Sequence, residues 1–207
     1  MAGLVLAALG GCAKRGDVSS SGMGIIQIRS ACPIVAVAAQ TGDVTLFDPP
    51  ASRLIEAVDV TASISNLKST CTEQGGQIVS NATFMVSAIR READKERMVN
   101  LPYFSTVVQG STQVVAKRIG TVQLYFPAGS LRSQAFATAT SSVDKAAATL
   151  PPDIEQLIAK PRKSGDFDAS VDPLSQPRVK EAIQRSSFEL LIGFNLTQDQ
   201  LRYNITR

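Results

Sequence analysis

The sequence contains no histidine and no tryptophan among its 207 residues, and only 5% of them are aromatic. Without imidazole, mechanisms that use histidine as a base, a proton shuttle or a metal ligand are excluded. No charge of one sign dominates, because 21 Lys and Arg against 18 Asp and Glu leave a net charge of +3. That balance lacks the basic footprint of a nucleic-acid-binding protein. We therefore expect no nucleic-acid partner, no metal and no cofactor.

The composition is that of a globular protein. Hydrophobic residues make up 44% of the chain and charged residues 19%, so the chain can bury a core. Its length corresponds to one domain with appended segments.

The N-terminus begins with an apolar run, residues 1–12, with no charge before Lys14. This run is far shorter than the roughly 20 residues that span a bilayer, so it is not a transmembrane helix. Small residues and then an abrupt polar segment follow the run. That layout is typical of a cleaved export signal.

The segment Leu9-Gly10-Gly11-Cys12 resembles the lipobox of a bacterial lipoprotein precursor, in which leucine lies three residues before the cysteine and a small residue just before it. The resemblance implies cleavage between Gly11 and Cys12 and acylation of Cys12, with palmitate as a typical chain. Residues 1–11 would then be the signal peptide, and residues 12–24 the lipidated cysteine and a flexible tether.

The residue after the cysteine carries a further implication of the resemblance. Ala13 stands where the family's inner-membrane retention signal has Asp, which implies an outer-membrane protein facing the periplasm. Each buried methylene contributes about 0.8 kcal/mol, so two or more acyl chains anchor a protein stably. The alternatives are an ordinary secretory signal and an apolar strand with a chance cysteine.

Cys32 and Cys71 remain as an even pair. In an oxidising compartment a disulfide between them is the default expectation, and closing a loop of about 40 residues contributes roughly 4 kcal/mol in the chain-entropy model. Two unpaired buried thiols are the alternative.

The clearest structural signal is a period of two between Val58 and Ser65, where apolar and polar residues alternate. This pattern predicts a half-buried antiparallel strand, and Gly75-Gly76 predicts a turn into a partner strand, residues 77–90. Shorter strand-like segments occur at residues 25–28, 33–38, 44–47, 103–108, 113–116, 121–126 and 134–141. The charged segment from Arg90 to Arg97 indicates a solvated loop or short exposed helix.

The C-terminal third differs in pattern. Residues 152–159 and 177–185 have helical periodicity within a loop and helix excursion at about residues 150–186. Residues 187–206 predict closing strands. The whole pattern predicts one domain, residues 25–207, that is mainly β: a two-layer antiparallel β-sandwich with one or two short helices late in the chain. It is similar to immunoglobulin-like and fibronectin-like sandwiches, although the buried tryptophan of immunoglobulin domains is absent.

Two Ser-x-x-Lys motifs are candidates for a Ser-Lys acyl-transfer site, Ser65 with Lys68 and Ser142 with Lys145. Lys163-Ser164-Gly165 resembles the third motif of penicillin-binding enzymes. However, Ser65 lies in a strand pattern, whereas this chemistry places Ser and Lys one helical turn apart. Lys163 also follows Ser142 too closely to build the site of that family.

A calcium site is the other candidate, at Asp166, Asp168 and Asp172, but the glycine and the terminal Glu of a calcium loop are missing. We expect no catalytic residues and no enzyme activity.

The sequence therefore favours a non-catalytic accessory or assembly subunit of an envelope complex, anchored to the membrane by lipid and acting by contact with an envelope protein. Strand edges are the expected docking surface. The alternative is a binding module for a small ligand, glycan or peptidoglycan, and an acyl-transfer enzyme comes third.

Overall fold

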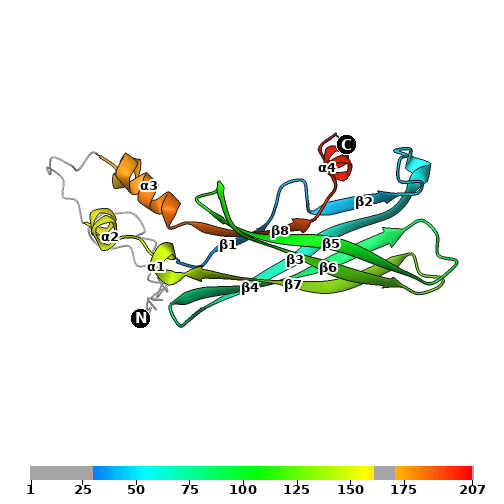
Figure 1. Cartoon of the computed structure of the whole chain (residues 1–207), viewed down its shortest axis with the longest axis horizontal. Coiled ribbons are helices and arrows are strands. Elements are labelled where there is room, and N and C mark those ends of the chain that lie inside the picture. Colours follow the sequence, from blue (N-terminus) through cyan, green and yellow to red (C-terminus); the bar gives the residue numbers. More distant parts are fainter. Residues whose placement is uncertain (1–29, 161–170, 207) are drawn as a thin grey trace, which may run out of the picture.

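The computed structural model describes residues 30–160 and 171–206, which form an elongated two-layer β-sandwich with short helices at its periphery (Figure 1). The strands are β1 (Ile34–Val37), β2 (Asp43–Phe47), β3 (Val58–Gln74), β4 (Gln77–Arg90), β5 (Arg97–Gln109), β6 (Gln113–Phe126), β7 (Arg132–Asp144) and β8 (Phe188–Phe194). The helices are η1 (Ile55–Ala57), α1 (Lys145–Ala148), α2 (Pro152–Ala159), η2 (Pro173–Ser175), α3 (Pro177–Arg185) and α4 (Gln198–Thr206).

Two four-stranded sheets face each other, one in the order β2-β3-β4-β7 and the other in the order β1-β8-β5-β6. The described pairings are antiparallel apart from the short parallel pair of β1 and β8. The predicted mainly-β sandwich is confirmed. The likeness to an immunoglobulin-like sandwich extends to the two layers and not to the strand order, because the sheets here run β2-β3-β4-β7 and β1-β8-β5-β6, whereas constant-type immunoglobulin sheets run ABED and CFG.

The core lies between the sheets and follows from the period-two pattern. Along β4, Ala82, Phe84, Val86 and Ala88 point inward and are almost fully buried, while the residues between them face outward. Fully buried aromatic and aliphatic side chains of the other sheet, among them Phe126, Phe194, Leu124 and Ile192, complete the core.

The long hairpin of β3 and β4 and the helices α2 and α3 match their predicted ranges. The prediction of separate strands on either side of Gly120 was wrong, because β6 continues through it. Gly120 lies opposite Tyr103, and a Cβ at Gly120 would lie 2.5 Å from Cζ of the Tyr103 ring. This glycine therefore makes room for a cross-strand aromatic ring and does not form a turn.

The predicted closing strands at residues 187–206 were only half right. Residues 188–194 form β8, but residues 198–206 form helix α4. The reason is a capping box: the Gln200 backbone N–H donates to Thr197 Oγ1, and the Thr197 backbone N–H donates to Gln200 Oε1. The side chain of Asn204 then fixes α4 to the connection between β1 and β2, since Nδ2 donates to the carbonyls of Gln40 and Asp43.

The segment predicted as a solvated loop from Arg90 to Arg97 contains a buried arginine. Arg90 is only 3% exposed, and its guanidinium stacks 5.2 Å from the centroid of the Phe126 ring. The guanidinium donates to four backbone carbonyls, those of Ala93, Lys95, Pro127 and Ser130. These belong to the β4–β5 and β6–β7 loops, so one side chain orders both loops at the sandwich end opposite α1, α2 and α3 (Figure 1).

Replacing Arg90 with methionine keeps an apolar stem of similar length but leaves the four carbonyls without their donor. We expect Arg90→Met to lower the free energy of unfolding by about 3 kcal/mol, measured by urea denaturation of the full chain. The control is Arg118→Met at an exposed arginine of β6, for which we expect a change within about 0.5 kcal/mol. Equal midpoints for the two variants would contradict the role of Arg90.

Candidate functional site

Several residues singled out in the sequence lie outside the described part of the chain. They are the cleavage site at Gly11 and Cys12, the remainder of residues 1–24, the strand predicted at residues 25–28, the motif Lys163-Ser164-Gly165, and Asp166 and Asp168. The lipid anchor and tether therefore stay predictions. Asp172 is described, and its carboxylate caps η2 by accepting from the Leu174 backbone N–H.

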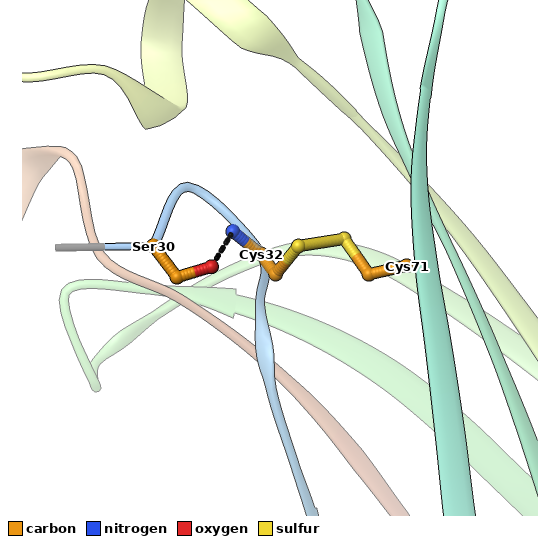
Figure 2. The surroundings of a disulfide bond; sticks show 3 residues. All are labelled: Ser30, Cys32 and Cys71. Carbon is orange, nitrogen blue, oxygen red and sulfur yellow. Dashed lines mark hydrogen bonds between the residues drawn. A yellow bond between two sulfur atoms is a disulfide. The ribbon is translucent and has the colours of Figure 1, made fainter. Parts of the chain in front are cut away.

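Cys32 and Cys71 form the predicted disulfide (Figure 2). Cys32 precedes β1, the edge strand of one sheet, and Cys71 lies on β3 of the other sheet. The backbone N–H of Cys32 also donates to Ser30 Oγ at 3.1 Å. The bond therefore fastens the start of the described chain to the opposite layer of the sandwich.

The two Ser-x-x-Lys motifs are not built as Ser-Lys pairs. Ser65 and Lys68 lie on β3, on either side of a register shift. Ser142 on β7 donates its hydroxyl to Gln77 Oε1 at 3.0 Å, and the Lys145 ammonium forms an ion pair with Glu73. Neither motif has its Ser and Lys one turn apart on a helix, the arrangement that the acyl-transfer chemistry uses.

The four edges of the sandwich differ in how they are protected against pairing with another strand. β1 has only four residues, and β2 has five with a register shift near its end. β6 carries Lys117 and Arg118 and a bulge at Val115, where it pairs with β5. Short length, charge and bulges are the devices that block edge pairing.

β7 lacks these devices. It pairs with β4 over thirteen residues without a register shift, from Arg132 opposite Ile89 to Asp144 opposite Gln77. Its only charged residues are these two ends, and residues 133–143 contain no proline and no glycine. A long, regular and uncharged edge of this kind is a template for an added strand.

Side chains on β7 fit a docking role. On the outer face, Phe136 is 67% exposed and lies opposite Met85 of β4, with Thr138 next to it along the same face of β7. On the inner face, Ser133 donates to the carbonyl of Tyr125. The Tyr103 hydroxyl reaches from the opposite sheet to the carbonyl of Thr138 at 2.8 Å, on the side of β7 that faces away from β4. A carbonyl oxygen has two acceptor sites, so Thr138 can still accept a hydrogen bond from an added strand.

A shallow concavity of about 320 Å³ lies over the outer face of the β2-β3-β4-β7 sheet. Most of its lining residues are polar, with one cationic side chain, Arg132, and one carboxylate, Asp43. Hydroxyl groups of Thr61, Ser63 and Ser87 come from the central strands. Such a surface can bind a small polar ligand through hydrogen bonds.

The loop end opposite α1, α2 and α3 is held by charged and polar pairs. Arg97 binds Asp59 through two hydrogen bonds of 2.8 and 2.6 Å, and this pair raises the pKa of Arg97. The Tyr125 hydroxyl donates to Glu96 at 2.7 Å, which raises the pKa of Tyr125 because a nearby carboxylate disfavours the phenolate. These contacts stabilise the loop end and do not form a cluster of catalytic groups.

Comparisons with known proteins identify no family. No protein-family model matches the chain, and no curated protein or solved structure matches it. Within residues 30–160 and 171–206, no helix is long and apolar enough to cross a membrane. The same residues hold no group of three or more acidic or cysteine side chains placed to bind a metal ion.

The β7 edge is a candidate docking surface that the sequence indicated only in general terms. The absence of charge from residues 133–143 does not locate this edge by itself, because residues 98–116 are uncharged as well. Strand order decides whether such a run is central or at an edge, and that order depends on contacts between distant segments.

Proposed function

We infer that the protein is a lipid-anchored lipoprotein of the bacterial outer membrane that faces the periplasm and acts without catalysis, as an accessory or assembly subunit of an envelope complex. The observation that carries its mode of action is the open edge of β7. A partner strand added there gains backbone hydrogen bonds along the edge and side-chain contacts with Phe136.

Two observations support the envelope location. Leu9-Gly10-Gly11-Cys12 has the lipobox pattern, and the Cys32–Cys71 disulfide belongs to an oxidising compartment. The described chain reaches β1 from the end of the sandwich where α1 lies (Figure 1), so a tether from Cys12 would join the domain at that end. A tether confines the domain near the membrane and raises its effective concentration toward a neighbouring partner.

A second candidate is a binding module for a small ligand, a glycan or peptidoglycan, and the concavity lined by Arg132 and the hydroxyl groups favours it. The two candidates use different groups of one sheet. Strand addition uses the backbone of the β7 edge, whereas ligand binding uses the outer face, with residues from β2, β3, β4 and the start of β7. The Ser-Lys enzyme ranks below both, because each motif lies outside a helical turn.

Intact mass of the protein extracted from membranes tests the anchor. We expect loss of residues 1–11, acyl chains on Cys12, and a mass two hydrogens lower than that of the reduced chain because of the Cys32–Cys71 bond. We expect Cys12→Ser to move the protein from the membrane fraction to the soluble fraction. An unmodified chain that keeps its initiator methionine would sink the anchor proposal.

Placing a charge on the β7 edge tests the docking surface. We expect Thr138→Lys to reduce capture of envelope proteins by the full chain at least about tenfold, because a lysine on an edge opposes strand addition. The matched control is Thr83→Lys, which places the same charge on the same face, at the position opposite Thr138 on the central strand β4. Capture should survive in this control.

Equal capture by both lysine variants would contradict the edge proposal. If neither variant affects capture but soluble peptidoglycan fragments shift the NMR signals of Thr61 and Ser87, the concavity is the binding surface and the second candidate replaces the first.

A further inference from the structure

The arrangement of charge on β7 is symmetric. Arg132 lies six residues before Thr138, and Asp144 lies six residues after it. In an antiparallel pair of two β7 strands centred on Thr138, the Arg132 of each copy would therefore lie opposite the Asp144 of the other. Oppositely charged residues directly across an antiparallel pair stabilise it, and like charges destabilise it.

The other positions are compatible with the same register. On the outer face, Phe136 would lie opposite Thr140 and Gln134 opposite Ser142, so each pair joins side chains that can contact without burying a charge. On the inner face, the residues are small, namely Ser133, Ala135, Ala137, Ala139 and Ser141, with Val143 at one end. Small side chains here let the second strand approach without a clash.

Both charged ends of β7 are available for such pairs. Arg132 is exposed and forms no ion pair within the part of the chain that the structure describes. Asp144 is exposed as well, and its Oδ1 accepts from the Ala146 backbone N–H at the start of α1. A carboxylate has further acceptor sites, so this cap leaves room for an arginine.

We propose that β7 pairs with β7 of a second copy of this chain, antiparallel and centred on Thr138, and joins two four-stranded sheets into one continuous sheet. The two-fold axis passes through Thr138, and the interface is isologous, the commonest form for a homodimer. This inference rests on the proposed docking function of the β7 edge and names its partner. The Arg132 and Asp144 pairs set the register.

Charge reversal at the two ends tests this register in the full chain carrying Cys12→Ser. In Arg132→Asp, both ends of a homodimer bring two acids together, and in Asp144→Arg, both ends bring two arginines together. We expect each variant alone to raise the dimer dissociation constant about tenfold or more in analytical ultracentrifugation. Mixing the two variants places an aspartate opposite an arginine at both ends, so the mixture should form a heterodimer with near wild-type affinity.

The design separates folding from pairing. Asp144→Arg also removes the cap of α1, which could unfold the variant. A folded Asp144→Arg chain should still form the heterodimer with Arg132→Asp, whereas an unfolded chain should not, so the mixture shows whether the variant folds. Arg118→Asp, on the β6 edge, should dimerise like the wild type. A wild-type chain that stays monomeric, or an Arg132→Asp variant that dimerises normally, would overturn the proposal.

The outcomes also separate this inference from the proposed function. If the protein is monomeric, and Thr138→Lys reduces its capture of an envelope protein, self-pairing is overturned and the docking function stays intact. A charge-dependent dimer that captures no envelope protein would support self-pairing and overturn the accessory role.

Discussion

A sheet that does not close on itself ends in two strands, and each of these has backbone N–H and C=O groups with no strand beside them. This sandwich therefore has four edges. Whether another strand can be added at an edge depends on how that edge is protected against pairing. Three edges are short, charged or bulged, whereas β7 is long, regular and uncharged between its ends. The same hydrogen-bonding requirement that builds the two sheets thus leaves one site at which a further strand would be stabilised.

The rest of the fold holds that edge in place. The Tyr103 hydroxyl reaches from the opposite sheet to the carbonyl of Thr138, and Gly120 provides the space through which the ring passes. Arg90 orders the loops at one end of β7, while the disulfide fastens the first described residues to β3. Because these contacts come from distant parts of the chain, β7 is presented as a rigid strand, and rigid edges lose little entropy when they bind.

Much of this fold is readable from the sequence, because periodicity is a local property. The alternation at Val58–Ser65 predicts β3, and helical spacing predicts α2 and α3. The misassigned elements have identifiable causes. The polar sequence Thr197 to Gln200 resembles a turn between strands, although it is a capping box, and Arg90 stands among solvated charges, although its carbonyl partners lie up to 40 residues away. Which strand becomes an edge follows from topology, which periodicity does not encode.

The most direct test of the central claim, that β7 is an edge built for pairing, is a single cysteine at its centre. Residues directly opposite in an antiparallel pair have Cα atoms about 4.5 to 5.5 Å apart, within the range that a disulfide spans. Under mild oxidation, the full chain with Cys12→Ser and Thr138→Cys should form a covalent dimer on a non-reducing gel. The same chain with Thr83→Cys, on the neighbouring central strand, should stay monomeric. Equal cross-linking of the two, or none at Thr138→Cys, would contradict the account.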